Sequence, residues 1–118
     1  MSTINLFRYE TDLIAFNEGQ VIFSEGEDGD TMYVIREGLV DLTSGQQRVA
    51  SLSENEFFGE MALIDKKPRS ATAVAATDCR VLPVNQKRFL YMVQETPFFA
   101  IEVMTTMCER IRRLNQQS

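Results

Sequence analysis

The chain has 118 residues with 44% hydrophobic and 25% charged side chains, which predicts one globular domain rather than a disordered chain. It contains no histidine, so Ser-His-Asp and Cys-His catalysis and most catalytic zinc sites are excluded. The net charge of −5 argues against general nucleic-acid binding, but residues 61–118 carry 9 basic and 5 acidic side chains and leave room for a small bound anion.

Short strands are predicted over the first two thirds of the chain. Runs of β-branched and aromatic residues alternate there with glycines, a pattern typical of an antiparallel sandwich, barrel or jelly roll. We therefore expect a β-roll from about residue 12 to about residue 84. The predicted strands are Leu13–Phe16, Val21–Phe23, Met32–Ile35, Leu39–Thr43, Val49–Leu52, Ala71–Ala76 and Cys79–Val84.

The segment between the fifth and sixth predicted strands breaks this pattern. Gly59 permits a turn that a Cβ atom would obstruct, and Glu60–Ile64 are good helix formers for one or two turns. A helix that begins there directs free backbone N–H groups toward one point, where an anion can bind. Pro68 disfavours a helical Lys67, and Arg69 is expected to open the next strand with a guanidinium suited to bidentate phosphate contact.

Other side chains of this segment fit a small polar ligand. Glu60 is an acceptor suited to a sugar hydroxyl, and the small residues Ala62, Ser70 and Ala71 leave room for a ligand close to the backbone. A structural alternative exists for each polar residue. Glu60 and Arg69 would otherwise form an ion pair that contributes little if exposed, and Ser70 would be an ordinary strand hydroxyl.

Two helices are predicted after the roll, from about residue 85 to about residue 115. Asn85–Gln94 has helical spacing of its apolar residues, and Pro97 ends that helix and suits the first turn of the next. We expect Met92, Met104 and Met107 to lie in a helix core or a dimer seam. From Phe98 onward an amphipathic stripe predicts a helix. Its members recur at steps of three and four residues: Ile101, Met104, Cys108, Ile111 and Leu114.

The remaining charges and thiols have ordinary interpretations. Arg110, Arg112 and Arg113 are expected to be solvated charges that match the dipole of the last helix. Cys79 and Cys108 are too few for a disulfide framework, and we expect both to be reduced and buried. The chain has no charged-then-apolar leader and no long uncharged segment, which favours a cytoplasmic protein without a membrane segment.

Two motifs resemble those of cyclic-nucleotide-binding domains. Phe58–Leu63 together with Pro68–Ala73 resembles the phosphate-binding cassette of that family, and Glu25–Gly38 resembles its glycine-anchored hairpin. The resemblance extends from about residue 10 to about residue 114. It implies a mainly β fold: an antiparallel β-roll or jelly roll that contains a short cassette helix and is followed by two α-helices.

The resemblance also implies a role for each site residue. Glu60 would accept a hydrogen bond from the ribose 2′-hydroxyl, and Arg69 would pair with an exocyclic oxygen of the cyclic phosphate. Backbone N–H groups and the Ser70 hydroxyl would complete the phosphate site, and an apolar strand residue would pack on the base. The expected ligand-binding residues are Leu42, Gly59, Glu60, Met61, Ala62, Arg69, Ser70 and Ala71.

Three positions qualify the resemblance. Phe23 stands where the family usually has a smaller aliphatic residue, which predicts a packing adjustment. Leu114 and Asn115 align with polar side chains that contact the base in bacterial transcription activators of this family. That base contact is therefore not carried over to this chain.

The function that the resemblance implies is a non-catalytic cytoplasmic sensor of cAMP, with cGMP as the second candidate ligand and with no cofactor or metal. The C-terminal helices would close as a lid, and the output would be homodimerisation through the last helix or binding of an effector protein, without direct contact to nucleic acid or membrane. Alternatives are a domain of a larger channel, kinase regulatory subunit or regulator, a jelly-roll enzyme, and a domain that has lost its ligand. The lack of histidine disfavours the enzyme, and intact Glu60 and Arg69 disfavour the loss of ligand.

Overall fold

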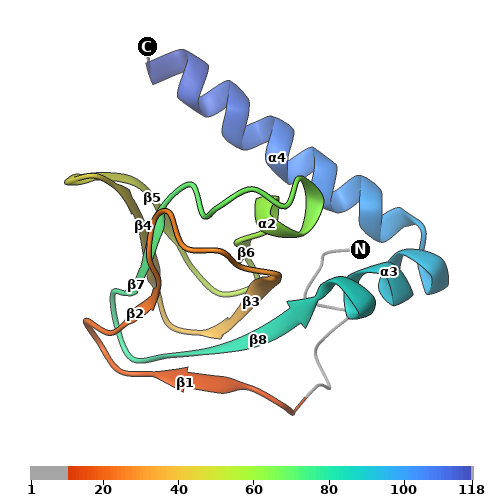
Figure 1. Ribbon diagram of the computed structural model, residues 1–118, viewed down its shortest axis with the longest axis horizontal. Coiled ribbons are helices and arrows are strands. Elements are labelled where there is room, and N and C mark those ends of the chain that lie inside the picture. Colours follow the sequence, from red (N-terminus) through yellow and green to blue (C-terminus); the bar gives the residue numbers. More distant parts are fainter. Residues whose placement is uncertain (1–10, 118) are drawn as a thin grey trace.

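The computed structural model describes residues 11–117, which form two four-stranded antiparallel sheets followed by two helices (Figure 1). The first sheet has the order β1 (Ile14–Phe16), β8 (Cys79–Asn85), β3 (Thr31–Glu37) and β6 (Phe57–Phe58). The second has the order β2 (Val21–Phe23), β7 (Thr72–Ala75), β4 (Val40–Ser44) and β5 (Gln47–Leu52). Strands far apart in the sequence pair in both sheets, so the predicted β-roll is confirmed.

The first sheet is buried on both faces because successive residues of a strand point to opposite sides. Val34 of β3 packs in the cluster that includes residues of α4, whereas its neighbour Ile35 packs in the cluster between the two sheets. Phe57 and Phe58 of β6 divide in the same way. The sheet therefore carries the helices on one side and the second sheet on the other.

Three helices follow from local sequence signals. α2 (Met61–Ile64) is a single turn, and α3 (Gln86–Glu95) begins where the side chain of Asn85 accepts a hydrogen bond from the backbone of Arg88 at 2.8 Å. α4 (Phe98–Gln117) runs over the side of the roll on which α2 lies (Figure 1). Within residues 11–117, no helix is both long and apolar enough to span a membrane.

Two sequence expectations about strands are wrong. The short strand β6 was not predicted, and β7 begins at Thr72 rather than with Arg69. The backbone of Arg69 pairs with the β2–β3 loop instead of with a sheet strand: its N–H donates to Glu27 and its carbonyl accepts from Gly26, both at 2.8 Å. This pairing ties the cassette segment, residues 58–73, to that loop.

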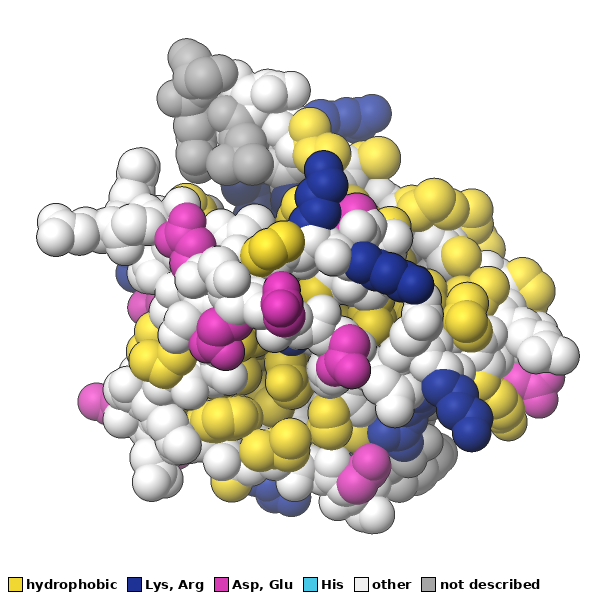
Figure 2. Space-filling model, viewed as in Figure 1, with side chains coloured by type: hydrophobic (Ala, Val, Ile, Leu, Met, Phe, Trp, Pro, Cys, Tyr) yellow, Lys and Arg dark blue, Asp and Glu magenta, His cyan; other side chains and the backbone are white. Residues whose placement is uncertain are grey.

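The helix α4 has two apolar faces, and the sequence stripe identified the outer one. Phe99 and Val103 are buried against the first sheet, whereas Ile101 and Met104 are 48% and 51% exposed. Figure 2 shows hydrophobic side chains following α4 across the surface. The expectation of a helix core is therefore wrong for Met104, whereas Met92 and Met107 pack against the core. The side chain of Leu114 lies outside the described residues.

The two cysteines also differ. Cys79 is buried between the sheets, as predicted, but Cys108 is exposed on α4, so the prediction that it is buried is wrong. Its position on the outer face follows from its spacing of four residues after Met104 and three before Ile111. We call these four exposed side chains of α4 the outer stripe: Ile101, Met104, Cys108 and Ile111.

Candidate functional site

A cavity of about 410 Å³ lies between the second sheet, the cassette segment and α4. Its volume falls within the range of about 300–1,000 Å³ that is usual for small-molecule sites. All eight expected ligand-binding residues line this main cavity: Leu42, Gly59, Glu60, Met61, Ala62, Arg69, Ser70 and Ala71. Further lining residues were not among those eight: Phe23, Ser44, Val49, Ala50, Pro68, Met107, Arg110, Ile111 and Arg113.

Arg69 is the buried cation of the main cavity, with 7% of the residue exposed. Its Nη1 donates to the carbonyl of Gly59 at 3.0 Å, and its Nη2 donates to the carbonyl of Thr31 at 2.8 Å. The Nε atom is buried and has no hydrogen-bond partner among the described residues. The guanidinium thus has donor capacity that the protein does not use.

No carboxylate within residues 11–117 forms an ion pair with Arg69. Burial lowers the pKa of the Arg69 guanidinium, and the charges of nearby groups, among them Tyr33, Asp30 and Glu27, oppose that shift. A buried charge without a paired counter-charge is costly. The main cavity is therefore suited to receive an anion.

Two glycines make room for this guanidinium. A Cβ atom on Gly29 would lie 2.4 Å from Arg69 Nε, and one on Gly59 would lie 2.8 Å from Nη1. Gly59 also has a φ of +81°, which a residue with a side chain rarely adopts. The sequence indicated the turn at Gly59, but only the structure brings Gly29 from the β2–β3 loop to the site.

The first turn of α2 adds backbone donors to the main cavity. The carbonyl of Glu60 accepts from the N–H groups of Leu63 and Ile64, at 3.1 and 3.3 Å. The N–H groups of Met61 and Ala62 stand one turn earlier, where a helix has no acceptor for them. Because Met61, Ala62 and Arg69 line the same cavity, these N–H groups are candidate donors to an anion bound there.

Glu60 is buried, and its partner lies on α4. Its Oε1 accepts from Nη1 of Arg110 at 2.8 Å, and Arg110 also donates to the carbonyl of Phe57 and stacks 4.8 Å from the centre of that ring. The expectation that Arg110 is a solvated charge is therefore wrong. So is the structural alternative of an ion pair between Glu60 and Arg69, which the described residues do not form. No local pattern reveals Arg110, because its partner is 50 residues away.

The cyclic nucleotide-binding domain model matches residues 13–96, which is most of the chain. The chain belongs to the cyclic nucleotide-binding domain family. The match includes the whole cassette segment and ends before α4, so Arg110 lies outside it.

Individual relatives support the assignment. The chain is 39% identical, over 71% of its length and 18% of the relative's, to a cAMP-dependent protein kinase regulatory subunit of Candida albicans. It is 33% identical, over 82% of its length and 47% of the relative's, to a cyclic AMP receptor protein of Thermus thermophilus. Among solved structures, the Thermus thermophilus catabolite activator protein superposes with a TM-score of 0.84 at 26% identity, over 97% of this chain and 56% of that one. The chain spans less than half the length of either curated relative.

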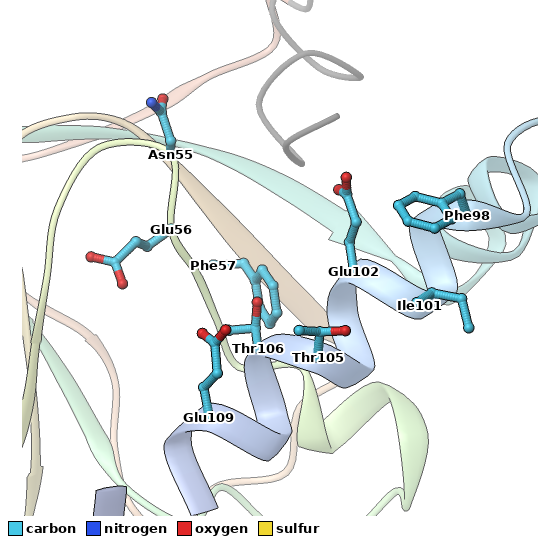
Figure 3. A pocket seen from close by; sticks show the side chains of 9 residues that line it. All are labelled: Asn55, Glu56, Phe57, Phe98, Ile101, Glu102, Thr105, Thr106 and Glu109. Carbon is cyan, nitrogen blue, oxygen red and sulfur yellow. The ribbon is translucent and has the colours of Figure 1, made fainter. Parts of the chain in front are cut away.

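This cyclic nucleotide-binding domain also has a second cavity, of about 390 Å³, lined by Phe57 and by residues of α4 (Figure 3). We call it the acidic groove, because Glu56, Glu102 and Glu109 line it and no Lys or Arg is among its described lining residues. Figure 3 shows Thr106 of α4 directed toward Phe57. Three carboxylates disfavour an anion here, so the main cavity is the better candidate.

Ser70 and Leu42, two further expected ligand-binding residues, are not fully buried in the protein. The hydroxyl of Ser70 is exposed and lies 3.8 Å from the sulfur of Met61. Leu42 is half-buried on β4, between Ala73 of β7 and Ala50 of β5. No group of three or more metal-binding side chains occurs within the part of the chain that the structure describes.

Proposed function

We propose that this domain is a regulatory sensor that binds a cyclic purine mononucleotide, cAMP in preference to cGMP, in the main cavity. The observation that carries the proposal is Arg69: a buried guanidinium with an unused donor, no carboxylate partner in residues 11–117, and a lining position in a cavity of suitable size. Family membership and relatives named for cyclic AMP support the choice of ligand.

Each lining group has a chemical task in this proposal. Arg69 and the N–H groups of Met61, Ala62 and Ala71 bind the cyclic phosphate, with the Ser70 hydroxyl as a further donor. Glu60 accepts from the ribose hydroxyl. The base packs on Leu42 and on side chains of α4. No group in this set is an activated nucleophile, which supports a receptor rather than an enzyme.

Arg110 connects the ligand to α4 in this mechanism. Met107, Arg110, Ile111 and Arg113 line the main cavity, so a bound nucleotide contacts α4 directly. Glu60 would then hold both the ribose hydroxyl and Arg110. Because the ligand contacts α4 only when α4 lies against the roll, binding shifts the equilibrium toward that closed position.

The output of the sensor is self-association through the outer stripe. Its members, Ile101, Met104, Cys108 and Ile111, follow each other at steps of three, four and three residues, the a and d spacing of a coiled coil. Asn115 occupies the next a position, and asparagine there favours a parallel, in-register dimer. This pairing needs neither a membrane nor a nucleic acid.

Calorimetric titration with cAMP and cGMP, side by side, tests the ligand. We expect one site per chain and cAMP tighter by about tenfold, near 1.4 kcal/mol, because the mostly apolar base region discriminates weakly. No heat of binding with either nucleotide, and no change in melting temperature, would refute the function. A clear preference for cGMP would show that Ser70 contacts the base rather than the phosphate.

Mild oxidation tests the association. In a parallel dimer Cys108 faces Cys108 of the second copy, so diamide should produce a disulfide-linked dimer, faster with cAMP present, and Cys108→Ser should abolish it. In an antiparallel pair Cys108 would face Met104, and no linked dimer would form. Sedimentation of a monomer at all concentrations, with and without cAMP, would refute association through the outer stripe.

A further inference from the structure

The guanidinium of Arg69 lies against an aromatic ring. Its Cζ is 4.0 Å from the centre of the Phe23 ring, well within the distance of about 6 Å at which cations and rings attract each other. Phe23 comes from β2, is buried and lines the main cavity. The contact therefore lies inside the site that holds the anion.

Phe23 is itself held by two other rings. Its ring centre lies 6.1 Å from that of Tyr33 and 5.8 Å from that of Phe58, and the last two are 5.4 Å apart. All three distances are typical of packed aromatic pairs, which occur at about 4.5–7 Å. Because Phe23 belongs to one sheet and Tyr33 and Phe58 belong to the other, the three rings join both sheets beneath Arg69.

The ring and the hydrogen bonds restrain different movements of the guanidinium. The carbonyls of Gly59 and Thr31 fix the two Nη atoms, whereas the ring of Phe23 supports the Cζ atom. Arginine has many rotamers, and ordering it upon ligand binding would weaken affinity. In this domain the contacts with Phe23, Gly59 and Thr31 already order the Arg69 side chain when the protein folds.

We propose that Phe23 is a positioning residue, whose ring holds the Arg69 guanidinium in the orientation that binds the anion. The negative face of the ring also offsets part of the burial of a cation that has no carboxylate partner in residues 11–117. The inference deepens the proposed function and rests on it, because the anion is the cyclic phosphate.

The electrostatic part of the role can be separated from shape by fluorination. Replacing Phe23 with 3,4,5-trifluorophenylalanine keeps the ring but removes most of its negative face. We expect cAMP affinity to fall by about three- to tenfold, with little change in folding. Phe23→Leu should reduce affinity by about five- to thirtyfold, equal to about 1–2 kcal/mol.

A double-mutant cycle then identifies Arg69 as the group through which Phe23 acts. In the Arg69→Ala background, Phe23→Leu should change affinity by less than about twofold. Leu42→Ala is the matched control, because it also removes apolar lining of the cavity, and its effect should be the same in both backgrounds. An equal effect of Phe23→Leu in both backgrounds would show that Phe23 only shapes the cavity, and would overturn the proposal.

A measurement without nucleotide separates this inference from the proposed function. ¹⁵N relaxation of the Arg69 Nε–H should report an ordered group in the ligand-free protein and a more mobile one after Phe23→Leu. Unchanged order in that variant would overturn the positioning role. If the unmodified protein bound no cyclic nucleotide, the proposed function would fail while the relaxation result still decided whether Phe23 orders Arg69.

Discussion

Removing the charge of Arg110 should lower the free energy of unfolding by about 2 kcal/mol. The side chain of its partner Glu60 is 8% exposed and that of Arg110 is 22% exposed. Breaking a fully buried ion pair costs about 3–5 kcal/mol, whereas an exposed pair contributes less than about 1 kcal/mol. Because Arg110 retains some contact with water, the expected value lies between these limits. Arg110→Met is the suitable change, since it keeps an apolar stem of similar length and removes only the guanidinium that lies over the Phe57 ring.

Urea unfolding followed by circular dichroism measures this effect, with Glu60→Gln and the double variant completing a cycle. We expect a coupling of about 1 kcal/mol or more and an unchanged denaturant slope, so that the double variant loses less than the two single variants together. Glutamine at 60 keeps an acceptor oxygen without the charge, which isolates the ionic part. A coupling below about 0.3 kcal/mol would refute the view that this pair attaches α4 to the cassette segment.

Three other variants test separate parts of the site. Glu60→Ala should weaken the binding of cAMP by about 1.5–3 kcal/mol but hardly change the binding of 2′-deoxy-cAMP. An equal loss of affinity for both ligands in competition assays would place Glu60 away from the ribose. Gly29→Ala should reduce cAMP affinity at least about tenfold in the same assay. The added Cβ would lie 2.4 Å from Arg69 Nε and would displace the guanidinium, so unaltered affinity would contradict the placement of Arg69 against Gly29. In a Cys108→Ser protein, Cys79 should react with iodoacetamide only during unfolding, because Cys79 is 3% exposed in the native protein. Burial also raises the pKa of the Cys79 thiol, so less of the reactive thiolate is present at neutral pH. Rapid alkylation of the native protein would contradict this prediction.

The sequence was informative wherever neighbouring residues determine the structure. Glycine-bounded β-branched runs located most strands, and Asn85 and Pro97 marked the ends of α3 and the start of α4 correctly. The cassette segment was recognisable because a glycine, a short helix and Arg69 follow each other at fixed spacing. β6 was missed since its two residues, Phe57 and Phe58, carry no alternating pattern.

Features that depend on distant contacts were not predictable. Arg110 resembles a solvated charge at a helix end until α4 folds over the cassette segment and brings it to Glu60. The apolar spacing of α4 fits two faces, and only packing shows that Phe99 and Val103 are the buried ones. At Phe23 the sequence predicts only a packing adjustment, because it cannot show that a ring of β2 lies against Arg69.

Titration of cAMP into the unmodified, Arg69→Ala and Arg69→Lys proteins tests most directly whether Arg69 holds the cyclic phosphate. Loss of the main charged partner of a buried phosphate costs about 2–5 kcal/mol, so Arg69→Ala should bind at least about 25-fold more weakly. Arg69→Lys should recover only part of the affinity, because an ammonium cannot form two parallel hydrogen bonds. Equal affinities of the unmodified and Arg69→Ala proteins would contradict the proposed site.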